Sequence, residues 1–129
     1  MHKHFIGGEW VAGHSASPNT NPSDLSEVVG EYAQADAALT RQAIAAANGA
    51  RAIWARSTAQ DRADVLERIG IEILSRREEL GTLLAREEGK TLPEAVGEIV
   101  RADSIFKFFA AKTIRIPGEL APPMRRGVE

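Results

Sequence analysis

The sequence contains no cysteine and no long apolar run. The absence of cysteine from the 129 residues excludes disulfide bonds and thiolate metal sites, and it suits a reducing compartment. No apolar stretch reaches the roughly 18 residues that indicate a membrane span, and no N-terminal run of the signal-peptide type is present. We therefore expect a soluble cytoplasmic protein without a membrane partner.

Aromatic residues are scarce, and the chain has no excess of positive charge. The formal net charge is −2, so no basic field is available to attract nucleic acid, and we expect no nucleic-acid partner. Hydrophobic residues make up 43% of the sequence, but 21 of them are alanine and only 5% of the chain is aromatic. Because alanine buries little area, the apolar faces are expected to need more partner surface than this chain supplies.

The predicted fold class is mainly α with a small N-terminal β element. Residues 1–34 are predicted to form a β hairpin, a loop and a strand, residues 35–115 a helical segment, and residues 116–129 an extended proline-rich tail. The tail supplies no closing helix or strand. We therefore expect the three regions to form one incomplete domain.

The β element is predicted from three short segments. Residues 5–11 indicate a hairpin with Gly7-Gly8 as its two-residue turn. Residues 13–24 are rich in serine, asparagine and proline and predict a loop, whereas residues 26–33 indicate a third strand. No strand–helix–strand repeat follows, so these strands are expected to form a small antiparallel sheet or to extend another sheet.

The rest of the chain predicts four helices with recognisable ends. Asp36 is placed to cap the first, and residues 57–61 hold two overlapping capping boxes for the second. The third, or a continuation of the second, ends at Gly89, and the fourth begins at Thr91 with Glu94 completing a capping box. Apolar spacing predicts the buried stripes, which are Leu39, Ala43, Ala46, Ala47, Ala50 and Trp54, then Leu66, Ile69, Gly70 and Ile73, then Leu80, Leu83 and Leu84, then Ala95, Ile99, Ala102, Phe106 and Phe109.

Motifs for nucleotide binding and nucleophilic catalysis are absent from the sequence. There is no Gly-x-Gly-x-x-Gly loop, no phosphate-binding loop that ends in Lys-Ser/Thr, and no nucleophile elbow. Three histidines near the N-terminus are interpreted as surface residues, and four glutamates around the last helix junction as helix-start charge and a solvated face. These residues are His2, His4 and His14, and Glu87, Glu88, Glu94 and Glu98.

The last helix junction resembles the N-terminal part of the NAD(P)-dependent aldehyde dehydrogenase superfamily. The family pattern there is Glu-x-Gly-Lys-x-x-x-Glu-Ala followed by an aromatic pair, which residues 87–95 and Phe108-Phe109 match. The residues from Phe5 to Trp10 resemble the opening hairpin of the family, and those from Asn19 to Pro22 its Asn-Pro loop. Residues 45–54 and 62–69 resemble its first two helices, so the resemblance covers nearly the whole chain and favours the semialdehyde dehydrogenases.

The resemblance implies a parent enzyme that oxidises an aldehyde or semialdehyde to a carboxylic acid with NAD or NADP. In the family a thiolate attacks the aldehyde, hydride passes to the nicotinamide, and a glutamate activates the water that releases the acid. These groups and the main nucleotide contacts belong to later parts of the family sequence. We therefore expect a non-catalytic N-terminal fragment with no catalytic or cofactor-binding residues, which binds NAD(P) poorly by itself. Its expected partners are the remainder of the dehydrogenase chain and further copies in a homo-oligomer.

Two family sites fall on positions that are present in this chain. Relatives hold a monovalent cation between backbone carbonyls before Asn-Pro and a carboxylate before Gly-Lys, which implies a site at Asn19, Thr20 and Glu87. Glu87 replaces the usual aspartate and is one methylene longer. Arg101 aligns with the substrate entrance, where an arginine would suit the distal carboxylate of an acidic semialdehyde. The alternative for Arg101 is an ordinary solvated helix position.

A second function class remains open at the level of sequence. The chain could be a self-standing helical interaction or oligomerisation module without catalysis. The proline-rich tail and the alanine-rich helix faces favour the dehydrogenase fragment, and so does the family resemblance. A self-standing module would unfold cooperatively as a monomer or symmetric dimer, whereas a fragment would expose apolar helix faces.

Overall fold

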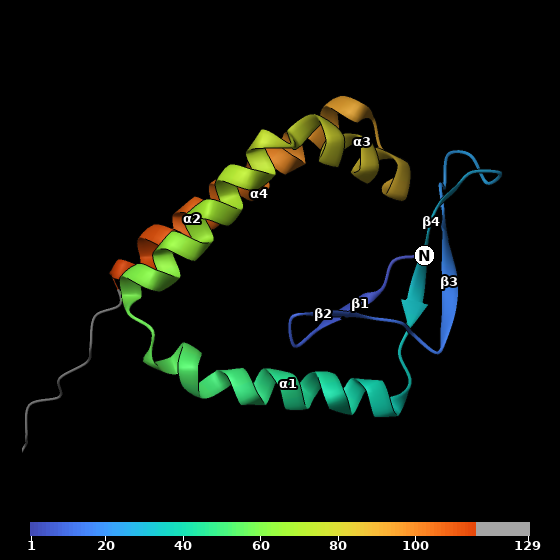
Figure 1. Ribbon diagram of the computed structural model, residues 1–129. Helices are drawn as coiled ribbons and strands as arrows, with labels where there is room; N and C mark the ends of the chain where they lie inside the picture. The colour runs from blue at the N-terminus through green and yellow to red at the C-terminus, as the bar shows by residue number, and fades with distance from the viewer. Residues whose placement is uncertain (116–129) are drawn as a thin grey trace, which may run out of the picture.

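The computed structural model describes residues 1–115, and it is mainly helical with two small β-sheets near the N-terminus, which confirms the predicted fold class (Figure 1). The predicted extended tail at residues 116–129 lies outside the described residues. None of the four described helices combines the length and the apolar character that a bilayer crossing requires. The elements are β1 (His4–Ile6), β2 (Glu9–Val11), β3 (Ser15–Thr20), β4 (Val28–Gln34), α1 (Ala37–Arg56), α2 (Ala59–Ser75), α3 (Arg77–Glu88) and α4 (Leu92–Ile114).

The first sheet is the predicted hairpin of β1 and β2. The strands pair antiparallel, with His4 opposite Val11, and the turn between them consists of Gly7 and Gly8. Both glycines have positive φ angles, 61° and 91°. A two-residue turn that follows the twist of the strands needs this left-handed backbone, which glycine adopts without a steric penalty.

The loop predicted over residues 13–24 is wrong at residues 15–20, because Ser15–Thr20 form strand β3. This strand pairs antiparallel with β4, from Ser15 opposite Gln34 to Thr20 opposite Val28. Its first four side chains are exposed, so it has no apolar alternation that a sequence pattern could reveal. The strand predicted at residues 26–33 is confirmed as β4, which begins two residues later.

The predicted helix starts are confirmed with one exception. Asp36 caps α1, and its Oδ1 accepts a hydrogen bond from the backbone N–H of Leu39 at 2.7 Å. Thr58 and Asp61 form the capping box of α2. The second predicted box does not form, because Ser57 is the C-cap of α1 and its hydroxyl donates a hydrogen bond to the carbonyl of Trp54 in that helix.

The helices pack closely because small residues line their contacts. α2 and α4 run side by side along most of their length, and α3 lies against α4 (Figure 1). A methyl group placed on Gly70 of α2 would lie 3.0 Å from Oδ1 of Asp103 on α4. Within residues 1–115 the buried apolar side chains are those of four alanines: Ala33, Ala63, Ala95 and Ala110.

The predicted stripes are buried only where one helix meets another. In α2 and α4 most of the predicted positions are buried or half-buried, but Ile69 is 38% and Phe109 52% exposed. The buried face of α4 instead passes through Asp103 and Ala110. In α3, Leu83 is also 38% exposed. The prediction that Ile69, Leu83 and Phe109 are buried is therefore wrong for the described residues.

Helix α1 departs most from its predicted stripe, since it has no buried residue. It lies against the β1–β2 hairpin and apart from the α2–α4 pair (Figure 1). Leu39, Ala43 and Ala46 are half-buried, whereas Ala47, Ala50 and Trp54 are exposed. The sequence therefore marks an apolar face on this helix that the described residues leave uncovered.

A pair of glycine substitutions tests the packing of α3 on α4. A methyl group on Gly81 would lie 2.6 Å from Cγ2 and 3.0 Å from Cα of Val96, whereas one on Gly97 meets no atom within 4 Å. Gly81→Ala should therefore lower the free energy of unfolding by about 1–3 kcal/mol, because the helices must move apart. Gly97→Ala should raise it by about 0.5–1 kcal/mol through helix propensity. Urea denaturation of both variants measures the difference, and equal effects would contradict the packing.

Candidate functional site

The junction between α3 and α4 lies against the loop that connects β3 and β4. Gly89 ends α3 with a left-handed backbone, φ 69°. A methyl group at this position would lie 2.7 Å from Cγ of Pro22 and 2.9 Å from Oγ of Ser23. The hydroxyl of Ser23 also donates to the carbonyl of Gly89 at 3.3 Å. Glycine is therefore needed both for the helix end and for the contact with the loop.

Glu87, on the last turn of α3, joins the helix to both strands of the second sheet. Its Oε1 accepts a hydrogen bond from Nδ2 of Asn19 on β3 at 2.9 Å and another from the hydroxyl of Tyr32 on β4 at 2.8 Å. The hydrogen bond to Glu87 raises the pKa of Tyr32 above its ordinary 10.0, and burial and the carboxylate charge act in the same direction. The three side chains therefore form one hydrogen-bonded group.

Unlike Glu27 and Glu98, Glu87 has no basic side chain paired with it among residues 1–115. Glu27 pairs with Arg86 at 2.7 Å, and Lys90 pairs with Glu98 at 2.6 Å. The half-buried Glu87 receives hydrogen bonds only from neutral groups. Its negative charge is therefore stabilised by dipoles within the described part of the chain, without a cation.

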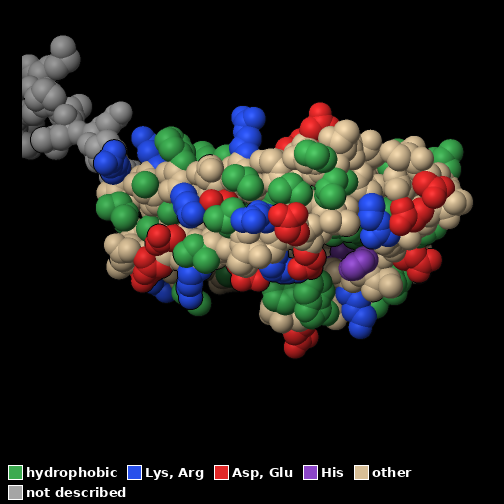
Figure 2. Space-filling view, turned by 90° about the horizontal axis from the view of Figure 1, so that it is seen from above, with side chains coloured by type: hydrophobic (Ala, Val, Ile, Leu, Met, Phe, Trp, Pro, Cys, Tyr) green, Lys and Arg blue, Asp and Glu red, His purple; other side chains and the backbone are tan. Residues whose placement is uncertain are grey.

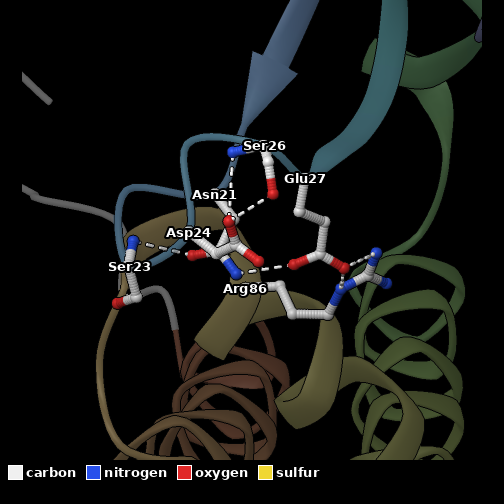
Figure 3. Close-up of polar contacts among 6 residues, drawn as sticks. All are labelled: Asn21, Ser23, Asp24, Ser26, Glu27 and Arg86. Atoms are coloured by element: carbon white, nitrogen blue, oxygen red, sulfur yellow. Dashed lines mark hydrogen bonds and ion pairs between the residues drawn. The ribbon is translucent and has the colours of Figure 1, made fainter.

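A second polar group fastens the loop to α3 (Figure 3). Nε of Arg86 donates to Oε1 of Glu27 at 2.9 Å, and Nδ2 of the buried Asn21 donates to Oε2 of the same carboxylate at 2.6 Å. Two hydrogen bonds lower the pKa of Glu27 below its ordinary 4.5, and the one from Asn21 has a larger effect than the one from Arg86. Oδ1 of Asn21 also accepts a hydrogen bond from the backbone N–H of Ser23 at 2.9 Å. The side-chain amide of Asn21 therefore binds both Ser23 and Glu27.

The inner turn of this loop closes on Asp24. Its Oδ1 accepts the backbone N–H of Ser26 at 3.0 Å and the hydroxyl of the same residue at 2.6 Å (Figure 3). These hydrogen bonds lower the pKa of Asp24 below its ordinary 3.8. The predicted Asn-Pro loop is therefore an ordered turn that fixes the positions of Asn21 and Glu27.

The structure brings together the residues of the predicted cation site. Asn19 and Glu87, 68 positions apart in the chain, are in hydrogen-bond contact, and Thr20 is the next residue of β3. The β3–β4 pairing is irregular between Asn19 and Thr20, and such a bulge disrupts the regular backbone ladder. A half-buried carboxylate without a basic partner among the described residues, hydrogen-bonded to a strand that is irregular at the same residue, has the chemistry that suits a hard cation. The cation site itself stays a prediction.

Arg101 lies apart from this group. It is exposed on α4, nine residues after the helix begins, which corresponds to roughly 13 Å along the axis. No hydrogen bond or ion pair of its side chain is found among residues 1–115. Its predicted role at a substrate entrance therefore stays a prediction.

Sequence reasoning missed the partners that hold the site together. Tyr32, Arg86 and Glu27 were not identified as site residues, although Glu87 and the Asn-Pro loop were. Tyr32 and Glu87 are 55 positions apart, and Arg86 and Glu27 are 59 apart. No local pattern relates residues at these separations. The only signal is that Tyr32 is the single tyrosine of the chain and lies in a predicted strand.

The Glu27 contacts predict a specific dependence of stability on pH. Because the folded-state pKa of Glu27 lies below 4.5, its carboxylate stabilises the fold above that pH and ceases to do so as the pH falls through the folded-state pKa. Urea denaturation from about pH 6 to about pH 3 should therefore show a smaller loss of stability for Glu27→Gln than for the unchanged protein. Glu67→Gln, which removes an exposed carboxylate of α2, is the matched control. Identical profiles for all three proteins would contradict a stabilising role of Glu27.

Comparison with known proteins identifies the family. A model of the aldehyde dehydrogenase family matches residues 10–129. The chain is 35% identical over 120 residues to the alpha-ketoglutaric semialdehyde dehydrogenase of Bacillus subtilis. This match covers 92% of this chain and 25% of that protein. The structure is similar to a succinate-semialdehyde dehydrogenase from Burkholderia pseudomallei, with a TM-score of 0.90, 35% identity, and coverage of 97% of this chain and 26% of that one.

A third relative shows the same coverage. An NAD-dependent benzaldehyde dehydrogenase from Corynebacterium glutamicum has a TM-score of 0.88 and 37% identity, and the similarity covers 97% of this chain and 28% of that one. The chain thus spans about a quarter of the length of the relatives it matches. The matched region contains the helix junction, the Asn-Pro loop and all four helices. The chain belongs to the aldehyde dehydrogenase family.

Proposed function

We propose that this chain is the non-catalytic scaffold part of an NAD(P)-dependent dehydrogenase that oxidises a semialdehyde to a carboxylic acid. The observation that carries the proposal is the family match over residues 10–129. Relatives named for alpha-ketoglutaric and succinic semialdehydes support the substrate class, and a relative described as NAD-dependent supports the cofactor. The comparisons give no support to a self-standing helical interaction module.

The chemistry of the family assigns the reactive groups to another part of the protein. Oxidation in the family begins with attack of a cysteine thiolate on the aldehyde, and this chain has no cysteine. When bound, the nicotinamide cofactor supplies the acceptor for hydride. The described residues contribute helices and strands that support such a site from outside.

Uncovered apolar surface supports a partner that covers this chain. Phe5 and Trp10 of the hairpin are 63% and 67% exposed, and Ile53 and Trp54 of α1 are 74% and 52% exposed. Figure 2 shows one face of the molecule, on which hydrophobic side chains are interspersed with charged ones. The proposed partners are the remainder of the dehydrogenase polypeptide and, in a homo-oligomer, further copies of it.

The proposal includes a monovalent cation at the α3–α4 junction. The backbone carbonyls of Asn19 and Thr20 and the carboxylate of Glu87 would hold it, and its charge would compensate the unpaired carboxylate. Such a cation would tie β3 to the end of α3. The unusual glutamate is compatible with this role because two neighbouring donors already restrict its side chain.

The proposal assigns the acidic end of the substrate to Arg101. Its guanidinium is exposed and makes no ion pair among the described residues, so it is available to a carboxylate. Arginine and carboxylate groups form two parallel hydrogen bonds, which fix the orientation of a substrate as well as its affinity. The remaining walls of the entrance belong to the proposed partner part.

An exchange experiment tests the proposed function. Residues 10–129 should replace the matching region of the Bacillus subtilis semialdehyde dehydrogenase, and formation of NADH or NADPH should be followed at its absorbance maximum. We expect the chimera to oxidise alpha-ketoglutaric semialdehyde, because the chain then supplies the scaffold for intact catalytic groups. The same enzyme lacking the matching region is the control. A folded chimera that is no more active than this control would contradict the proposal.

The same chimera tests Arg101. Arg101→Ala should raise the KM for an acidic semialdehyde by about tenfold or more, since a hydrogen bond to a charged group contributes about 1.5–3 kcal/mol. The KM for a neutral aldehyde should not change. Arg41→Ala, at an exposed position of α1, is the matched control. An unchanged KM for the acidic substrate would remove Arg101 from the substrate entrance.

A further inference from the structure

We propose that Tyr32 and Asn19 are positioning residues of the cation site, which hold one carboxylate oxygen of Glu87 so that the other oxygen faces the cation. The inference rests on the cation site of the proposed function and deepens it. It assigns a role to two side chains, whereas the resemblance implied only the backbone carbonyl of Asn19. Tyr32 has no counterpart in the predicted ligand set.

The inference rests on the unequal hydrogen bonding of the two carboxylate oxygens of Glu87. Oε1 accepts both hydrogen bonds, at 2.9 Å from Asn19 and 2.8 Å from Tyr32. No hydrogen bond or ion pair to Oε2 is found among residues 1–115. An ionised carboxylate can accept on both oxygens, so one oxygen stays available for a ligand. A cation bound at Oε2 need not displace either protein donor.

The side-chain length explains why two donors are needed. Glutamate has one more rotatable bond than the aspartate usual in the family, so an unrestrained carboxylate would sample several positions. The donors come from two adjacent strands, β3 and β4, and they reach Oε1 from different backbone positions. Two such hydrogen bonds select one orientation of the longer side chain and thereby offset its extra freedom.

Tyr32 is itself held in place. Its ring stacks on the imidazole of His2, with 4.7 Å between ring centroids and 21° between planes. His2 in turn is tied to β4, because its backbone N–H donates to the carbonyl of Glu31 at 2.7 Å and its carbonyl accepts from Ala33 at 2.9 Å. The N-terminal residues therefore act as a support behind the tyrosine. A supported donor can position a ligand more accurately than one on a mobile loop.

A purely structural role would predict something different from a positioning role. If the two hydrogen bonds only join the sheet to α3, their removal lowers stability and leaves cation affinity unchanged. If they position Glu87, their removal weakens cation binding beyond any effect on stability. The affinity for sodium, measured apart from the unfolding temperature, separates the two.

The experiment is a sodium titration of the full 129-residue chain at constant ionic strength, with choline chloride as the replacement salt. Binding is followed by the line width of the sodium-23 resonance and, separately, by thermal unfolding. Tyr32→Phe keeps the stacked ring and removes the hydroxyl, and Asn19→Ala keeps the backbone carbonyl and removes the amide. We expect both variants to raise the apparent Kd for sodium by about tenfold or more, as is typical when a group that orients a metal ligand is removed.

Two controls make the outcomes distinct. Glu87→Gln removes the charge and should abolish sodium binding, whereas Thr82→Val removes an exposed hydroxyl of α3, bonded to Glu78, and should leave binding unchanged. If the unchanged protein and Glu87→Gln respond alike to sodium, the cation site is overturned, and this inference with it. If sodium binding needs Glu87 but both variants bind as tightly as the unchanged protein, the cation site stands and the positioning role is overturned.

Discussion

The arrangement of this chain depends on the contact between the end of α3 and the β3–β4 sheet. Gly89 brings the helix end against Pro22, and Glu87 and Arg86 then reach side chains of the strands and their loop. The remaining route between sheet and helix pair runs through α1, which has no buried residue of its own. Without the contact at the end of α3, the two sheets would be connected to α2 and α4 mainly through α1, which makes few packing contacts.

The contact is made of charge and hydrogen bonds because the apolar core is too small to fix it. The buried apolar residues are alanines, and a buried methyl or methylene group contributes about 0.8 kcal/mol against about 1.5–3 kcal/mol for a whole Leu, Ile or Phe side chain. Small side chains allow α2 and α4 to approach closely, but they leave the larger apolar groups outside. Such a surface is consistent with the proposal that other parts of a dehydrogenase cover this chain.

The polar residues at the junction divide into two kinds. Glu27 is neutralised by Arg86 and fastens the loop, so its role is complete within the described residues. Glu87 meets only neutral donors and keeps an oxygen without a partner there. Of these two carboxylates, Glu87 is therefore the one to which the proposed cation is assigned.

Sequence alone determined the helices and most of their caps, because each cap depends on residues within a few positions of one another, and it indicated the family through the order of several short motifs along the chain. Asp36, the Thr58 box and Gly89 act on adjacent backbone groups, and their predictions were confirmed. The tertiary structure decided the rest. It made Ser15–Thr20 a strand, because a polar edge strand is selected by its neighbour's backbone and leaves no apolar pattern. It also brought Tyr32 to Glu87, because two side chains 55 positions apart meet only when the sheet packs on the helix end.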